Sequence, residues 1–211
     1  MFGIIDFKVF LISTILLTLT PGTDTLYILS RSISQGRKAG IYSTLGIVSG
    51  VFIHTLLAAF GLSIILAKSA LLFAIIKFVG MAYLVYLGIK MIVSKKINSI
   101  EDQPTIEHTS SKKMYVQGII TNVTNPKVVL FFLAFIPQFI DTGNSSPLSF
   151  VILGLIFSLV GGLWCIAIAN FASKLTNKFR KSTKSQYILN KMTGAIFITM
   201  GLKLLTTKPN Q

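Results

Sequence analysis

Two ionisable side chains, Asp24 and Lys127, lie within long apolar stretches of the 211-residue chain. Asp24 follows Pro21 by three positions, and Lys127 follows Pro126 directly. A carboxylate can bind an ammonium group or carry a proton, and a lysine ammonium can bind a carboxylate. A charge in the hydrocarbon core costs about 2.5–3.5 kcal/mol on insertion scales, so such groups normally face a partner or a cavity. The pattern predicts that the helices bearing Asp24 and Lys127 meet, with the two charges close together or bridged by water.

The two prolines interrupt helices, and the interruptions themselves offer binding groups. Because proline has no N–H to bond four residues back, Pro21 frees a carbonyl near Leu17, which needs a partner in protein or water. The N–H groups that begin each following half-helix suit a carboxylate, and the freed carbonyls suit an ammonium group. A zwitterionic amino acid presents both groups. The candidate substrate- or ion-binding residues are therefore Thr20, Pro21, Gly22, Thr23, Asp24, Asn125, Pro126 and Lys127.

A purely structural interpretation of these residues also fits the sequence. The prolines would be kinks, which are tolerated in membrane helices. Asp24 would cap the half-helix that begins at Thr25, and Lys127 would extend its ammonium toward an interface. Under the functional interpretation, Asp24 is in addition a possible proton carrier.

Composition places these residues in a membrane protein. The chain is 52% hydrophobic and only 12% charged, with a mean hydropathy of +0.74, whereas a soluble domain is about 25% charged. The basic residues that give the net charge of +14 are therefore interpreted by where they lie relative to the membrane spans. No nucleic-acid partner is expected. One cysteine excludes an intrachain disulfide. Two histidines give no basis for a metal site, and no cofactor is expected.

We predict an all-α polytopic membrane protein with six transmembrane helices in two inverted three-helix repeats, of which helices 1 and 4 are broken. The first repeat covers 1–93, a cytoplasmic linker covers 94–113, and the second repeat covers 114–211. Three spans are an odd number, so the second repeat is upside down, and paired breaks in inverted halves indicate a transporter's substrate site. Apolar runs of about 18–20 residues or more predict spans. These are 7–30, 41–67, 71–93, 114–140, 148–172 and 187–206.

Basic residues are distributed unequally between the two sides of these spans. Fourteen Lys and Arg residues fall on the side of the long linker and five on the other side. Cytoplasmic loops of membrane proteins carry the excess of Lys and Arg. The distribution therefore predicts a cytoplasmic linker and places both termini outside.

Several other residues within the spans are expected to serve packing. Two small-residue motifs allow helix backbones to approach closely; they are Gly36-x-x-x-Gly40 and Gly46-x-x-x-Gly50. Trp164 and Cys165 lie in mid-span and are expected to pack against neighbours. His54 is either a polar residue bonded to a neighbouring helix or a proton relay.

Two long motifs resemble the signatures of the LysE/RhtB family of amino-acid exporters. The first motif is the run TPGTDTLYILSRSISQGRKAGIYSTLGIVSGVFIHTLLAAFGLSIIL, and the second is GIITNVTNPKVVLFFLAFIPQFI. The family's Pro-Gly-x-Asp falls on Pro21 to Asp24, with Thr23 where a proline is often found, and its Asn-Pro-Lys falls on Asn125 to Lys127. The resemblance covers essentially the whole chain.

The resemblance implies export of amino acids or their derivatives across the bacterial inner (plasma) membrane, driven by the proton-motive force. Members that export basic amino acids tend to carry an acidic residue a few places after Asn-Pro, where this chain has Leu130 and Phe131. That difference favours neutral substrates such as threonine, homoserine or leucine. Export of basic amino acids or of another small derivative is the alternative.

Other classes of membrane protein fit less well. An enzyme would need clustered nucleophiles or ligands, and the spans supply one Asp, one His and one Cys. A channel would need rings of charge or a run of filter carbonyls. We therefore expect a transporter rather than an enzyme, with an amino acid, protons and the lipid bilayer as partners, and a homo-oligomer is possible.

Overall fold

The computed structural model describes residues 3–68, 70–93, 109–141 and 146–179, together with 191, 195, 198, 199 and 202. Linker residues 94–108 and most of the predicted sixth span, 187–206, lie outside the described residues. The described part is helical, apart from short connections and one isolated bridge between Ile4 and Ile140. The all-α fold class is thereby confirmed for this part of the chain.

The predicted first span is broken at Pro21, as expected. Helix α1 (Phe7–Leu19) ends before Thr20, whose backbone is extended, and α2 (Thr23–Leu57) begins after Gly22. Proline supplies no N–H to continue α1 and disfavours helical geometry in the residue before it. The predicted span 7–30 therefore contains α1 and the first residues of a second helix, α2.

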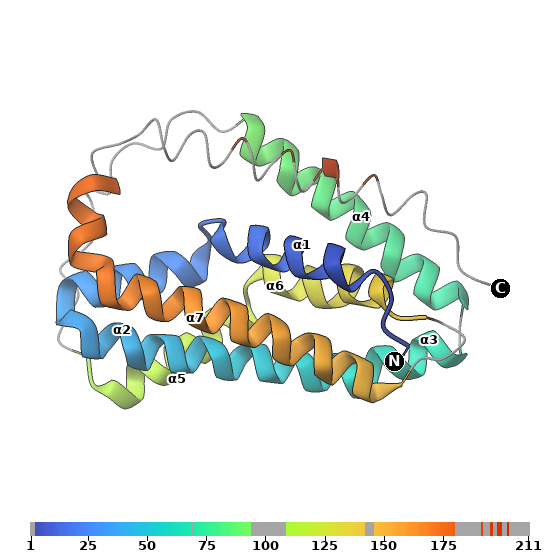
Figure 1. Cartoon of the computed structure of the whole chain (residues 1–211), viewed down its shortest axis with the longest axis horizontal. Coiled ribbons are helices and arrows are strands. Elements are labelled where there is room, and N and C mark those ends of the chain that lie inside the picture. The colour runs from blue at the N-terminus through green and yellow to red at the C-terminus, as the bar shows by residue number, and fades with distance from the viewer. Residues whose placement is uncertain are drawn as a thin grey trace.

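Helix α2 doubles back on itself at Gly36. This glycine has a φ of +82° and a ψ of 177°, a combination that L side chains rarely adopt. A Cβ built on Gly40 would lie only 2.0 Å from the Ser32 hydroxyl oxygen, although residues eight apart in a straight helix are about 12 Å apart. The ribbon turns at this point and runs back (Figure 1). Gly36 is thus a turn residue, and its predicted role in helix packing was wrong.

Beyond Leu57, the end of α2, the chain stays helical. A π-helical turn, η1 (Ala58–Leu62), leads into α3 (Ser63–Lys68), and α4 (Ala70–Val93) follows. Helix α3 ends one residue after the predicted span 41–67, and α4 begins one residue before the predicted span 71–93 and ends with it. The start predicted at 41 lies inside α2.

The second broken helix comprises four consecutive elements. They are α5 (Ser111–Val123), α6 (Pro126–Leu130), the π-helical turn η2 (Phe131–Phe135) and the 3₁₀ turn η3 (Ile136–Phe139). The axis bends by 48° at the break before Pro126, which confirms the interruption predicted within 114–140. Helix α5 begins at Ser111, three residues before the predicted span 114–140. Helix α7 (Pro147–Phe179) then contains the predicted span 148–172.

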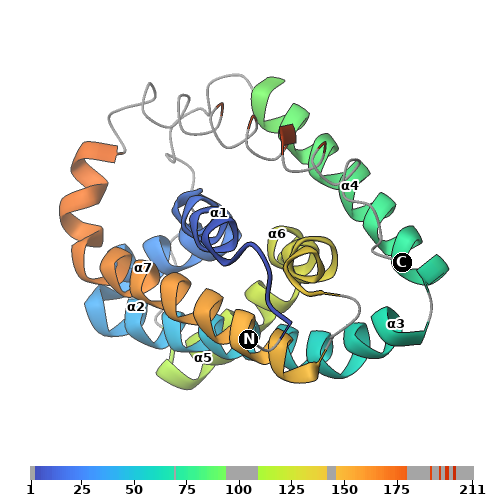
Figure 2. The same cartoon turned by 45° about the vertical axis from the view of Figure 1, so that its right-hand side comes forward.

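Small residues hold α2 against α5 and α7. A Cβ on Gly46 would lie 2.1 Å from the Tyr115 carbonyl oxygen, and one on Gly118 would lie 2.7 Å from the Ser43 carbonyl oxygen. Any side chain at these positions would push the helices apart, so the packing role predicted for Gly46 is confirmed. Figures 1 and 2 show α2, α5 and α7 as one layer, with α1 and α6 side by side upon it.

The exterior of this layered bundle is apolar. Large hydrophobic side chains such as Ile12, Phe60 and Leu159 are more than half exposed, which is the arrangement expected of a surface that faces lipid. Among the described residues, two helices are long and apolar enough to cross a membrane, or three if the bent pair counts as one span. They are Thr23–Ile65, Pro147–Ala172 and the pair Ser111–Val123 with Pro126–Phe139. The chain is a helical membrane protein, and the six-span inverted arrangement stays a prediction.

Candidate functional site

The first helix break is capped by a side chain from the second. Lys127 Nζ donates hydrogen bonds to the carbonyl oxygens of Leu17 and Thr20, at 3.1 and 3.0 Å. Leu17 lies four residues before Pro21 and carries the carbonyl that proline leaves without its helical donor. Gly22 leaves room for this contact, since a Cβ there would lie 3.3 Å from Nζ. The freed carbonyls do bind an ammonium group, and that group is Lys127.

The second break repeats this pattern with a different donor. The Asn125 N–H bonds the Asn122 carbonyl oxygen at 3.0 Å, as the Thr20 N–H bonds that of Leu17 at 3.3 Å. Asn122 lies four residues before Pro126, and its carbonyl oxygen is 3.3 Å from His54 Nε2. The predicted bond between His54 and a neighbouring helix is confirmed. Each freed carbonyl therefore contacts a ring nitrogen or ammonium from the other half of the chain.

Asp24 is held by Asn122. Asn122 Nδ2 donates to Asp24 Oδ2 at 2.7 Å, and the Asn125 side chain also faces the carboxylate. Helix α2 begins at Thr23 with Gly22 as its N-cap residue, so Asp24 lies inside the first turn and does not cap it. Within the described residues, Asp24 Oδ1 is buried without a hydrogen-bond partner. The carboxylate thus keeps one oxygen for another ligand.

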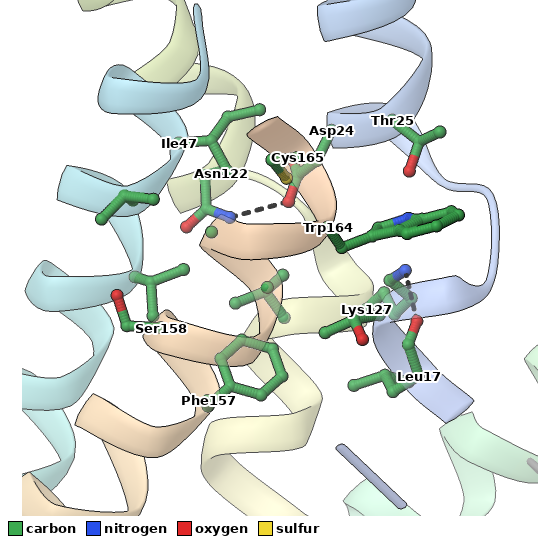
Figure 3. Close-up of a pocket in the computed structure, with 16 residues that line it drawn as sticks. Leu17, Asp24, Thr25, Ile47, Asn122, Lys127, Phe157, Ser158, Trp164 and Cys165 are labelled. Carbon is green, nitrogen blue, oxygen red and sulfur yellow. Dashed lines mark hydrogen bonds between the residues drawn. The ribbon is translucent and has the colours of Figure 1, made fainter. Parts of the chain in front are cut away.

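One cavity lies between these groups (Figure 3). Its volume is about 40 Å³, enough for roughly three water molecules by the usual requirement of 10–15 Å³ each. Asp24 and Lys127 both line it, although no salt bridge joins them in the part of the chain that the structure describes. The other lining residues are Leu17, Thr18, Thr25, Ile47, Val48, Val51, Asn122, Val128, Phe157, Ser158, Gly161, Gly162, Trp164 and Cys165.

The residues singled out in the sequence contribute to this site in different ways. Thr20 offers its backbone carbonyl, Gly22 contacts Lys127, and Asn125 accepts the Lys127 N–H at 3.1 Å through its side chain. Pro21 and Pro126 act through the breaks they cause. Thr23 is exposed and is not among the cavity-lining residues, whereas Thr25, two positions on, is.

Most of the cavity-lining residues were not predicted at the site, and three of them bear on its chemistry. Asn122 was not singled out, and Trp164 and Cys165 were expected only to pack, yet all three line the cavity. A signal for Asn122 exists in the sequence. Its distance from Pro126 equals that of Leu17 from Pro21, so the two positions correspond in the two breaks.

The two broken helices also contact each other on either side of the cavity. On one side, Arg31 donates to Thr109 Oγ1 at 3.0 Å and to Gln117 Oε1 at 2.8 Å. On the other side, the Ile5 N–H donates to the Phe139 carbonyl at 2.9 Å, and the Asp141 N–H donates to the Gly3 carbonyl at 2.7 Å. These contacts join the two broken helices near both ends of the bundle.

The fold and the site together define a helical membrane protein in which two broken helices meet at a small cavity lined by Asp24 and Lys127. Residues 15–208 match the family model described as LysE type translocator. The chain belongs to this family, which confirms the resemblance seen in the two motifs.

Relatives of similar length come from several bacteria. An uncharacterized membrane protein of Bacillus subtilis, YrhP, is 34% identical over 89% of this chain and 92% of its own length. An uncharacterized membrane protein of Pseudomonas aeruginosa is 30% identical over 97% of this chain and 96% of its own. The homoserine/homoserine lactone efflux protein of Salmonella typhimurium is 30% identical over 94% of this chain and 95% of its own. No solved structure matches the chain.

Proposed function

We propose that the protein is a secondary active exporter of neutral amino acids such as threonine, homoserine or leucine, from the cytoplasm to the outside. One observation carries the proposal: Asp24 and Lys127, from the two helix breaks, line a single cavity. A carboxylate and an ammonium in one site match the ammonium and carboxylate of an amino acid. Membership of a translocator family and similarity to a homoserine/homoserine lactone efflux protein support the same function.

The cavity favours a neutral side chain over a basic one. A basic amino acid carries a second cation, which needs a further acidic group in a buried site. Among the described residues that line the cavity, Asp24 is the only acid, and it is the partner of the α-ammonium. The wall is otherwise mainly apolar, with Ile47, Val51 and Phe157 among its members.

Proton-motive force is the proposed source of energy, and Asp24 is the proposed proton carrier. Moving one charge across the membrane field is worth about 2.3 kcal/mol per 100 mV. The buried Asp24 Oδ1, which accepts no hydrogen bond from the described residues, is a position where a proton can bind. No cofactor is required by this scheme.

The matched breaks support the inverted-repeat arrangement of six spans. In a transporter of this kind, the two repeats rock about the fixed site and expose it to either side in turn. The observed cavity, with room for roughly three waters, must widen before an amino acid enters. We place the protein in the bacterial inner (plasma) membrane with both termini outside.

Efflux from dipeptide-loaded cells tests the proposal. Cells with and without the protein are loaded with dipeptides containing threonine, homoserine, leucine or lysine, and the release of each amino acid is timed. We expect saturable release of one neutral amino acid that an uncoupler abolishes. Lysine release would favour the basic alternative, and equal release from both kinds of cell would contradict amino-acid export.

A further inference from the structure

Several polar atoms at the cavity keep unused hydrogen-bonding capacity. A lysine ammonium has three donors, and Lys127 uses two of them on backbone carbonyls. Trp164 Nε1 is buried and donates to no acceptor in the part of the chain that the structure describes. The Oδ1 atoms of Asp24 and Asn122 are likewise buried and, among those same residues, accept no hydrogen bond. Since buried polar groups are nearly always bonded, these atoms indicate a ligand.

We propose that the substrate's α-carboxylate binds between Lys127 and Trp164, while its α-ammonium binds Asp24 and the side-chain oxygen of Asn122. The inference rests on the proposed amino-acid export and adds the orientation of the substrate. A carboxylate only accepts hydrogen bonds and therefore matches the two unused donors, and an ammonium only donates and matches the two unused acceptors. In the view of Figure 3, Asn122 and Asp24 lie to the left of Lys127 and Trp164.

The carbonyls that Lys127 already binds explain why the substrate's ammonium faces Asp24 in this proposal. The carbonyl oxygens at the end of α1 could bind a substrate ammonium, but Lys127 already binds those of Leu17 and Thr20. A second cation at that position would be repelled by Lys127. The Asp24 carboxylate is the remaining charged acceptor in the cavity lining, as far as the structure describes it.

Trp164 is the residue at which a substrate-binding role can be distinguished experimentally from a packing role. Its ring lines the cavity beside apolar groups, so a packing role requires only its shape. A role in binding requires its N–H as well. Replacing the indole by a ring without a donor therefore removes the proposed contact and keeps most of the packing.

The experiment measures amino-acid counterflow by the full-length protein in liposomes. The labelled substrate is whichever of threonine, homoserine or leucine the protein exports. Its competitors are the unlabelled amino acid, the carboxamide, which lacks the carboxylate, and the 2-hydroxy acid, which keeps it. The variants are Trp164→Phe, Trp164→His, which retains a ring N–H, and Leu163→Ala, a control at the neighbouring position, where the side chain is 61% exposed.

We expect Trp164→Phe to weaken competition by the amino acid and by the 2-hydroxy acid about tenfold to a hundredfold, the usual effect of losing a hydrogen bond to a charged group. Competition by the carboxamide should fall several-fold less, Trp164→His should recover part of the loss, and Leu163→Ala should behave as wild type. Equal weakening of acid and amide would overturn the orientation while leaving export intact. Wild-type liposomes without counterflow of any amino acid would instead overturn the proposed function, and the orientation with it.

Discussion

The side-chain ammonium of Lys127 lies 3.1 Å from the carbonyl oxygen of Leu17, the oxygen that Pro21 leaves without a helical donor. At the other break, His54 Nε2 lies 3.3 Å from the corresponding oxygen of Asn122. Each broken helix is thus completed by a side chain from the other half of the chain. If one broken helix moves, the other loses a hydrogen-bond partner. The two halves of the chain are therefore coupled at the cavity.

Replacing Lys127 by methionine tests this link. Lys127→Met keeps the apolar stem but removes the two hydrogen bonds that the ammonium donates to the Leu17 and Thr20 carbonyls, and a hydrogen bond to a charged group contributes about 1.5–3 kcal/mol. We expect a lower free energy of unfolding in detergent micelles and loss of transport. Lys8→Met, which removes an exposed lysine of α1, should change stability by less than about 0.5 kcal/mol. A Lys127→Met protein as stable as wild type would show that the capping contact contributes nothing.

A methyl group at Gly50 should disturb Asp24 from a distance. A Cβ there would lie 2.7 Å from both Cβ and Oδ1 of Asn122, so Gly50→Ala displaces the amide that holds Asp24. Overpacking of this kind costs about 1–3 kcal/mol, and we expect transport to fall by about fivefold to a hundredfold, since about 1.4 kcal/mol represents a factor of ten. Gly61→Ala is the matched control, because nothing in the described structure lies within 4 Å of its Cβ position. Normal uptake and export by Gly50→Ala would argue against the Asn122–Asp24 bond as a requirement.

The features of this site that could be predicted from the sequence are those that arise from a residue and its neighbours along the chain. Proline removes a donor wherever it occurs, so the breaks at Pro21 and Pro126 and the freed Leu17 carbonyl followed from the sequence alone. The cost of buried charge likewise predicted that the helices bearing Asp24 and Lys127 meet, with the two charges close together or bridged by water. In contrast, a helix in lipid is apolar on all faces, and its periodicity does not show which face is buried. Trp164 faces the cavity and Leu163 faces outward, yet both belong to one apolar run.

The turn at Gly36 was missed for a related reason. Glycine serves both at close helix contacts and at positions of positive φ, and the small-residue motif indicated only the first use. Open space surrounds the Cβ positions of both Gly36 and Gly61 within the described structure, but only Gly36 has a positive φ. Gly36→Ala should therefore lower the free energy of unfolding by about 1–3 kcal/mol, whereas Gly61→Ala should leave it unchanged or raise it by up to about 1 kcal/mol. Similar thermal unfolding curves for the two variants would contradict the strained turn.

The contacts of Arg31 predict how the cavity opens toward one end. Arg31 holds Thr109 and Gln117 on that side, so Arg31→Ala should loosen the approach to the cavity. Cys165 is the only cysteine of the chain and lies buried in the cavity wall, where a thiol reagent can report access. We expect Arg31→Ala to raise the rate at which a membrane-impermeant reagent modifies Cys165.

That labelling must be compared from the two sides of the membrane. Only reagent added on the Arg31 side, which we propose to be cytoplasmic, should react faster. Arg37→Ala removes an exposed arginine near the same end and should leave the rate unchanged. Faster labelling from the opposite side, or in both variants, would show that Arg31 does not close this end.

Asp24→Asn tests Asp24 both as the proton carrier and as the partner of the substrate's α-ammonium. Asparagine has nearly the shape of aspartate, and its carbonyl oxygen can still accept the hydrogen bond that Asn122 donates to Asp24 Oδ2 at 2.7 Å. The variant cannot release a proton, however, so the site can no longer alternate between charged and neutral forms. Because the Asp24 carboxylate is also the proposed partner of the substrate's α-ammonium, Asp24→Asn should weaken exchange of amino acid for amino acid and abolish net export driven by a pH gradient. Asp6→Asn, which removes an exposed carboxylate before α1, should keep both activities. Because exchange and net export are measured in the same liposomes, unaltered pH-driven export by Asp24→Asn would assign the proton to another group.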